Sequence, residues 1–174
     1  SFINFNNIGM LKDLRQTRID KLNNLAKAGF EVYPEKSQKD YSNKYALENF
    51  DNLLDKEIFL IGRIRSLRQM GVLIFFHIED ESGKIQALLK EDISGKNAFK
   101  LFAENIDIGD FVQVEGKLFK TKSEEKTIEV KSWKILSKAI RPIPSEFYGL
   151  KDKEELLRKR YLDLIVNSET RELF

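Results

Sequence analysis

Residues 71–89 are GVLIFFHIEDESGKIQALL, two apolar runs joined by a short acidic turn that contains a glycine. This layout is typical of a β-hairpin. Because side chains alternate between the two faces of a strand, one set should point into a core and the other outward. The expected inward set is Ile74, Phe76, Ile78, Ile85, Ala87 and Leu89. The expected outward set, which would form one outer patch, is Phe75, His77, Gln86 and Leu88.

The same alternation recurs on both sides of this hairpin. Together with the hairpin it predicts five strands, at 57–68, 72–79, 84–90, 111–120 and 127–136. Between the third and fourth strands, apolar side chains are spaced as on one face of a helix, at Phe99, Leu101, Phe102 and Ile106. Five strands with a helix between the third and the fourth follow the order of an OB-fold. We therefore expect an all-β core with flanking helices, built as a five-stranded OB-fold barrel.

Helical patterns flank the barrel. Residues 11–28 carry leucine and isoleucine at mostly helical spacing, and Gly29 follows where a C-terminal cap belongs. A second helical pattern starts near residue 153, after a proline-containing linker, and shows no stop signal, so we expect a piece of a longer protein. The expected parts are an added or frayed end at 1–9, a helical extension at 10–56, the barrel at 57–136, and a linker leading into a further domain at 137–174.

Composition excludes several function classes. The 174 residues include no cysteine and one histidine, which disfavours a disulfide framework, a thiolate zinc site, a multi-histidine metal site and a serine–histidine triad. No apolar run approaches the roughly 20 residues that a membrane span needs. The net charge is +2 and no segment is a basic block, so binding dominated by phosphate neutralisation is not expected.

The expected outer patch suits a single-stranded base. An exposed aromatic ring offers a stacking face worth about 1–3 kcal/mol per base, and the Gln86 amide offers a donor and an acceptor to a base edge. Strands two and three are also the face on which OB-folds bind oligonucleotides. From the pattern alone, a contact with the first helix or with a partner subunit is an equal alternative. In this alternative, without nucleic-acid binding, His77 is a packing or solvated residue, and 117–126 is a solvated hairpin tip.

Several stretches resemble the N-terminal part of the bacterial-type lysyl-tRNA synthetases, a family of class II aminoacyl-tRNA synthetases. They are RIDKLNNLAKAGFEVYP, GRIRSLRQMG, HIEDESGKIQ, DIGDFVQVEGKLFKTK, LSKAIRPIPSEFYGLKDKEELLRKRYLDLIVN and SETRELF, and they cover nearly all of residues 15–174. The resemblance implies an OB-fold that recognises the anticodon of tRNA(Lys). In the full-length enzyme this domain would be joined to a catalytic domain that activates lysine with ATP.

The resemblance assigns roles to individual residues. Phe75 matches the family's base-stacking phenylalanine, and Gln86 matches its base-recognising glutamine. Glu125 matches the glutamate of the tip between strands four and five, which contacts an anticodon base, and Arg68 matches the arginine before MG. The expected RNA-binding residues are therefore Phe75, Gln86, Glu125 and Arg68, with His77 and Arg63 as supporting residues.

The sequence departs from the family pattern at a few positions. The family commonly has small residues just before Phe75, where this chain has GVLIF. It commonly has a glycine before Glu125, where this chain has Glu124, so the tip could differ in shape. A histidine is usual at Tyr148, and RYR is usual where LLR stands at 156–158.

The resemblance implies a cytoplasmic lysine–tRNA ligase in which the middle uridine of the anticodon stacks on Phe75 and hydrogen-bonds to Gln86. The fragment would contain no catalytic residue, metal site or cofactor, whereas ATP and Mg²⁺ would bind to the full-length enzyme. That enzyme is expected to be a homodimer, the fragment a monomer, and neither is expected to bind a membrane. The alternative is an OB-fold module that binds single-stranded nucleic acid without sequence preference or binds another protein.

Overall fold

The computed structural model describes residues 5–32, 34 and 36–139. The chain forms two compact units, one of residues 1–17 with 140–174 and one of residues 18–139. Helix α1 spans Phe5–Lys27, so it begins before the expected boundary at residue 10, and its residues from 18 on belong to the second unit. The expected linker and the helix after it lie outside the described residues from 140 on.

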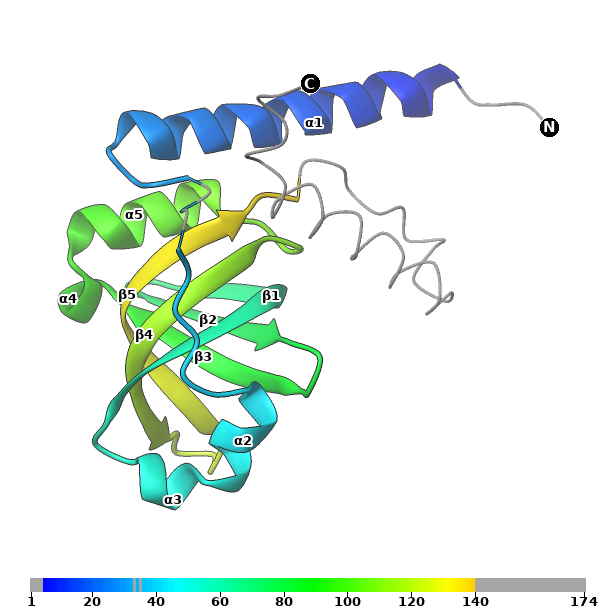
Figure 1. The fold of residues 1–174 in the computed structure, drawn as a ribbon. Helices are drawn as coiled ribbons and strands as arrows, with labels where there is room; N and C mark the ends of the chain where they lie inside the picture. Colours follow the sequence, from blue (N-terminus) through cyan, green and yellow to red (C-terminus); the bar gives the residue numbers. More distant parts are fainter. Residues whose placement is uncertain (1–4, 33, 35, 140–174) are drawn as a thin grey trace. The chain divides into compact units, whose positions relative to one another are not determined.

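Five strands close into a barrel in the order β1-β2-β3-β5-β4 (Figure 1). They are β1 (Glu57–Met70), β2 (Leu73–Glu79), β3 (Lys84–Lys90), β4 (Phe111–Lys120) and β5 (Lys126–Ser137). All neighbours pair antiparallel except β3 and β5, which pair in parallel. With helix α5 (Lys96–Asn105) between β3 and β4, this arrangement confirms the predicted OB-fold barrel.

The barrel interior is filled by the side chains that alternation predicted to point inward. The inward residues of β2 and β3 are at most 2% exposed, namely Ile74, Phe76, Ile78, Ile85, Ala87 and Leu89. Helix α5 covers this core with Phe102, whose ring centroid lies 4.9 Å from that of Phe76 and 5.1 Å from that of Trp133. The Trp133 ring is also stacked on Phe30, at 4.7 Å between centroids. The predicted helix therefore contributes to the core through its apolar face.

Short helices complete the unit. Two of them, α2 (Asn43–Glu48) and α3 (Phe50–Leu53), lie in the expected helical extension before the barrel. The Ser42 hydroxyl caps α2 by accepting the Tyr45 amide at 3.1 Å. Helix α4 (Glu91–Ser94) is a single turn after β3 that periodicity did not predict. No helix in the described part of the chain is long and apolar enough to cross a membrane.

The turn between β2 and β3 is organised by the carboxylate of Asp80. One oxygen accepts the Ser82 amide at 2.9 Å, the Ser82 hydroxyl at 2.6 Å and the Gly83 amide at 3.1 Å. The other oxygen accepts the Asn43 amide at 3.0 Å and lies 3.0 Å from the Lys39 ammonium. Burial by itself raises the pKa of Asp80, but the Ser82 and Asn43 hydrogen bonds and Lys39 bring that pKa down to about 2. The carboxylate thus fixes the hairpin turn against the start of α2.

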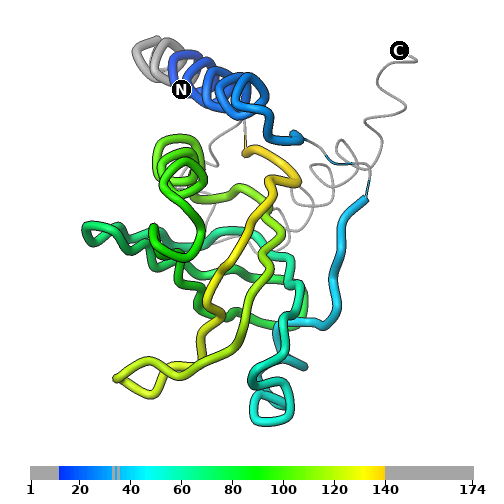
Figure 2. Tube along the Cα trace, turned by 90° about the vertical axis from the view of Figure 1, so that its left-hand side faces the viewer, coloured from blue at the N-terminus to red at the C-terminus, as the bar shows by residue number. Residues whose placement is uncertain are grey.

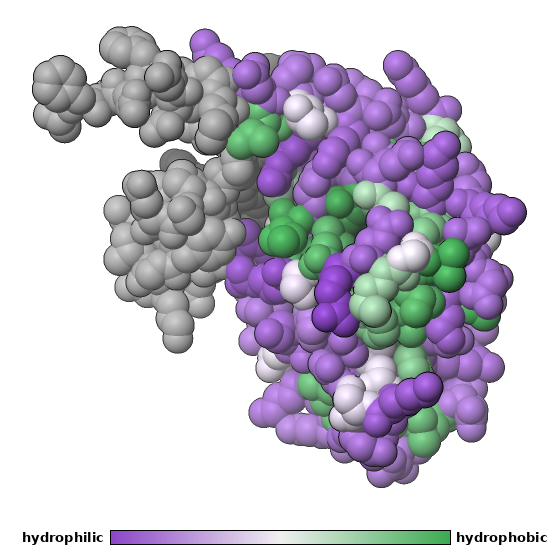
Figure 3. All heavy atoms as spheres, turned by 180° about the vertical axis from the view of Figure 1, so that it is seen from behind, coloured by the Kyte–Doolittle hydropathy of each residue, from purple (hydrophilic) through white to green (hydrophobic). Residues whose placement is uncertain are grey.

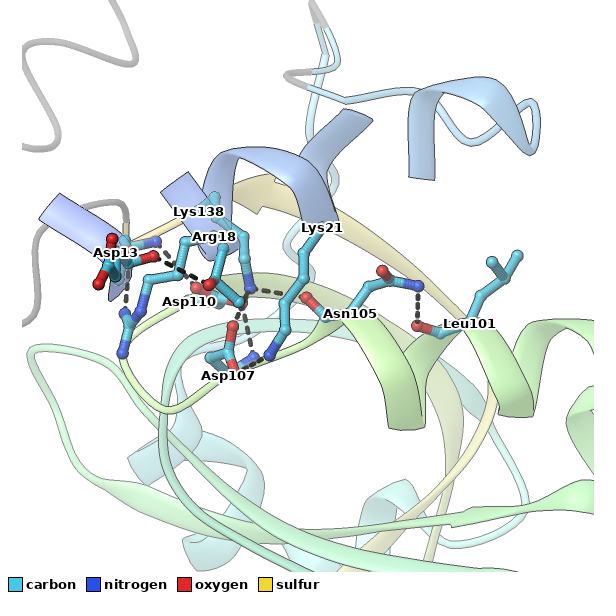
Figure 4. Close-up of polar contacts among 10 residues, drawn as sticks. Asp13, Arg18, Lys21, Leu101, Asn105, Asp107, Asp110 and Lys138 are labelled. Carbon is cyan, nitrogen blue, oxygen red and sulfur yellow. Dashed lines mark hydrogen bonds and ion pairs between the residues drawn. The ribbon is translucent and has the colours of Figure 1, made fainter. Parts of the chain in front are cut away.

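A buried lysine joins the far end of the barrel to α1 (Figure 4). The Lys138 ammonium, whose side chain is 0% exposed, donates to the Asn105 carbonyl and to Asp107, both at 2.6 Å, and to Asp110 at 2.5 Å. The other Asp107 oxygen lies 2.6 Å from the Lys21 ammonium of α1. Because a buried charge is tolerated only when it is paired, these groups depend on one another. The network therefore anchors the last part of α1 and the end of β5.

The tip between β4 and β5 is a tight turn that projects beyond the end of the barrel (Figures 1 and 2). The Thr121 amide donates to the Glu125 carbonyl at 3.0 Å, and the Glu124 amide donates to the Thr121 carbonyl at 2.9 Å. Glu124 has φ of +65°, a left-handed conformation that glycine adopts without cost. A glycine in the family pattern and Glu124 here are therefore compatible with the same turn.

Asp80→Asn should remove the pH-dependent part of the stability of this hairpin. The folded-state pKa lies below the ordinary value of 3.8, so the carboxylate stabilises the fold fully above pH 4 and loses its effect as the pH falls toward 2. At pH 7 the substitution should lower the free energy of unfolding by about 2 kcal/mol. Urea unfolding between pH 7 and 2 measures this, with Glu81→Gln as an exposed neighbouring control. Curves for wild type and Asp80→Asn that stay parallel over this range would contradict the assignment.

Glu124→Gly should stabilise the fold, because it relieves the left-handed backbone of the tip. The expected gain in the free energy of unfolding is about 1 kcal/mol. Glu124→Ala is the matched control, since it removes the same carboxylate but keeps a Cβ and should bring no gain. Equal stability of the two variants in thermal unfolding would show that the turn is unstrained.

Candidate nucleic-acid interface

The predicted outer patch follows from the pairing of β2 with β3 and β1. His77 lies opposite Gln86 on β3 and opposite Ser66 on β1. Phe75 lies opposite Leu88 on β3 and opposite Arg68 on β1. Phe75, His77 and Gln86 are half-buried, whereas each of their inward neighbours is buried. The register therefore confirms that these three side chains share the outer face of the barrel.

Leu88 is a correction to the expected patch. It lies on the same outer face but is only 4% exposed, and it is absent from the main hydrophobic core. Its cross-strand neighbours are Phe75 on β2 and Glu129 on β5, and Glu129 forms an ion pair with Lys90 at 3.0 Å. Leu88 is flanked on both sides because β3 pairs with β2 on one side and with β5 on the other. It supports the Phe75 ring from beside it and offers little surface to a ligand.

The Arg68 guanidinium lies beside the Phe75 ring. The guanidinium carbon of Arg68 lies 5.9 Å from the ring centroid, which is within the range of a cation–π contact. Arg68 is exposed, so its guanidinium stays accessible to water and to phosphate. The pair thus offers a ring for stacking and a cation in one place.

His77 is held between two polar partners. Its Nδ1 lies 2.7 Å from the Ser66 hydroxyl and its Nε2 lies 3.2 Å from a carboxylate oxygen of Glu125. A carboxylate can only accept, so Nε2 carries the proton toward Glu125, and in the neutral ring Nδ1 accepts from Ser66. His77, expected either to be a packed or solvated residue or to support RNA binding, therefore links the tip between β4 and β5 to the outer face of β2.

Gln86 has a partner that sequence analysis did not predict. The Thr127 hydroxyl donates to the Gln86 side-chain oxygen at 2.8 Å, and Thr127 itself is 0% exposed. The two residues are directly paired in the parallel β3–β5 ladder. That ladder joins segments 41 residues apart, which local periodicity does not reveal. The sequence feature that could have indicated this partner is the presence of polar residues at outward positions of the fifth strand.

Arg63 is not brought into the patch. It is 7% exposed and is paired with Phe111 on β4 and Glu79 on β2. The neighbouring residue Ile64 exchanges backbone hydrogen bonds of 2.8 Å with the loop before β4, through Gly109 and Asp110. This loop covers the part of β1 that contains Arg63. Arg63 therefore lacks the accessible side chain that its expected supporting role in RNA binding would require.

The surroundings of the patch are mixed in charge. Arg65 forms an ion pair with Glu79 at 3.2 Å, and the Lys126 ammonium donates to the Leu47 carbonyl at 2.9 Å. Seen from behind, the surface is mostly hydrophilic, with hydrophobic residues gathered near its middle (Figure 3). Within residues 5–139, apart from 33 and 35, no three histidine, aspartate or glutamate side chains gather to hold a metal ion. The arrangement is suited to binding through stacking and hydrogen bonds.

Comparisons with known proteins agree with this geometry. Residues 58–136 match the family model of the OB-fold nucleic acid binding domain, tRNA_anti-codon. The chain is 43% identical to lysine–tRNA ligase of Thermosipho africanus, over 92% of this chain and 33% of that protein. It is 44% identical to the enzyme of Carboxydothermus hydrogenoformans, over 94% of this chain and 33% of that protein. It is also 44% identical to that of Aquifex aeolicus, over 84% of this chain and 23% of that protein.

The chain spans about a third of the length of the first two of these relatives. Both the family match and these relatives fit the resemblance inferred from the sequence motifs. The chain therefore corresponds to a part of the lysine–tRNA ligases, about a third of their length, and its residues 58–136 match the OB-fold nucleic acid binding domain.

Proposed function

We propose that this chain recognises the anticodon of tRNA(Lys) through the outer face of β1, β2 and β3. The observation that carries the proposal is the placement of Phe75 and Gln86 on one accessible face, two residues apart along the paired strands. Diagonal neighbours of this kind are about 7–8 Å apart. A base stacked on the ring is then within reach of the amide.

Stacking and hydrogen bonding have different roles in the proposed recognition. The Phe75 ring accepts any base, because every base has a π-face, so it supplies affinity without selection. The Gln86 amide presents a donor and an acceptor, which match the carbonyl and ring N–H of uracil. Arg68, beside the ring, is placed to contact the phosphate of the stacked nucleotide. This division selects a middle uridine, as lysine anticodons require.

Glu125 is proposed to contact a second anticodon base. Its carboxylate is 48% exposed and accepts from His77, so it lies over the same face as the stacking pair. A carboxylate accepts hydrogen bonds only and therefore favours a base edge that presents N–H groups. His77 is a supporting residue in this proposal, because it holds Glu125 without needing to contact the RNA.

The activity of the whole enzyme is part of the same proposal. Recognition of tRNA(Lys) would serve a cytoplasmic, homodimeric lysine–tRNA ligase that forms lysyl-tRNA with ATP and Mg²⁺, and the fragment would be monomeric. In this proposal the described residues take no part in the ATP-dependent chemistry. Their role is to select the tRNA. A wrong base would leave polar groups of the site without hydrogen-bond partners, and this cost disfavours its binding.

Phe75→Ala should weaken binding of a lysine anticodon stem-loop by about 1–3 kcal/mol, because it removes the stacking face. Phe75→Tyr keeps the ring and should bind nearly as well as wild type. Fluorescence anisotropy with a labelled stem-loop at fixed salt measures both. Urea unfolding should show a small change in stability, since Phe75 is half-buried and lies outside the main core. A variant that is severely unstable but binds normally would identify Phe75 as a core residue.

Gln86→Leu should remove selection for the middle base while leaving the stacking face intact. Discrimination between a middle uridine and a middle cytidine should fall by about 1–2 kcal/mol, as expected for one or two lost hydrogen bonds. The measurement is a titration of two stem-loops that differ only at this base. Equal affinity of the wild type for both would favour a module without sequence preference. Unchanged discrimination in Gln86→Leu would transfer the selective role to another residue, with Glu125 the first to test.

A further inference from the structure

A glutamine side chain does not by itself distinguish uracil from cytosine. Its amide presents an oxygen acceptor and an NH₂ donor side by side, and rotation by half a turn about the last side-chain bond exchanges them. Uracil presents N–H and C=O, whereas cytosine presents a bare ring nitrogen and an exocyclic NH₂. A freely rotating amide could therefore pair with either base. Selection of uridine requires that one orientation be held.

The structure holds the Gln86 amide through Thr127. The Thr127 hydroxyl donates to the Gln86 oxygen at 2.8 Å, from a residue with no exposed surface on the adjacent strand β5. A carbonyl oxygen has two lone pairs, so this bond leaves the second lone pair of Gln86 and its whole NH₂ group available to a ligand. Held in this way, the amide presents its acceptor and its donor at fixed positions.

The other groups around Gln86 do not compete for the amide. The Thr127 hydroxyl also lies 3.1 Å from the Glu125 carbonyl, which accepts the Thr121 amide at 3.0 Å, but its distance to the Gln86 oxygen is shorter, at 2.8 Å. On the opposite side, both ring nitrogens of His77 are engaged, by Ser66 and by Glu125. The Thr127 proton is therefore available to Gln86, and His77 offers the amide no alternative partner.

We propose that Thr127 is a positioning residue that fixes the orientation of the Gln86 amide and thereby sets the preference for a base with a carbonyl over one with an exocyclic amine. The proposal rests on the proposed function, because it assumes that Gln86 contacts the base. Thr127 lies beside Gln86 on β5 and is fully buried, so we do not expect it to touch the RNA itself. Its removal should therefore change selectivity more than affinity.

The test compares Thr127→Val, which removes the hydroxyl and nearly preserves the shape, with Thr127→Ser, which keeps the hydroxyl. Each variant of the full chain is titrated with stem-loops that carry uridine or cytidine at the middle anticodon position. Thr127→Ser should retain the wild-type ratio of dissociation constants. Thr127→Val should reduce this ratio about fivefold or more, the effect of losing one oriented hydrogen bond. The reduction should come mainly from tighter binding of the cytidine stem-loop.

Two controls make the outcome decisive. Circular dichroism and thermal unfolding show whether Thr127→Val folds, and Thr127→Ala provides a second removal of the hydroxyl if it does not. A wild type that binds both stem-loops equally would overturn the proposed function and this inference together. A wild type that discriminates, with Thr127→Val discriminating equally well, would overturn the inference alone. Equal weakening of both stem-loops by Thr127→Val would also overturn it, since a merely structural role predicts that result.

Discussion

The site depends on the register between β2 and β3. His77 lies opposite Gln86 and Phe75 opposite Leu88, and a slip by one residue would turn these side chains into the barrel. Two constraints fix the register: the inward side chains of both strands are almost completely buried, and Asp80 holds the turn that joins them. Hydrophobic packing therefore sets the face, and a buried carboxylate sets the position of the hairpin turn. Together, the packing and the turn place the Phe75 ring and the Gln86 amide on the outer face.

Closure of the barrel places residues of β5 and of the β4–β5 tip beside this hairpin. The parallel pairing of β3 with β5 places Thr127 beside Gln86, and the tip between β4 and β5 places Glu125 beside His77. An open sheet would present the same ring and amide without these partners. In the proposed function, the β4–β5 hairpin orients the Gln86 amide and adds the Glu125 carboxylate to a face on which Phe75 supplies the stacking surface. A small barrel with little net charge would in this way suit the recognition of a few bases.

Sequence periodicity predicted the strands, the barrel order and the outward set well, because alternation is a local property of each strand. It failed where the environment of a side chain depends on a remote segment. Leu88 is buried by neighbours on two strands, and Arg63 is covered by the loop that contains Gly109. Thr127 and Ser66 were missed for the same reason, since their roles arise from pairing across strands. The resemblance to a family supplied Glu125 and Arg68, which no periodicity would single out.

We propose that the anticodon bases bind to the outer face of β2 and β3. The decisive measurement is NMR of the ¹⁵N-labelled chain, in which backbone amide chemical shifts are followed during titration with an unlabelled lysine anticodon stem-loop. We expect the largest shifts at Arg68, Phe75, His77, Gln86 and Glu125, with the amides around Lys138 at the far end of the barrel unchanged. Shifts concentrated around Lys138 and α5, with the five interface amides unaffected, would contradict it.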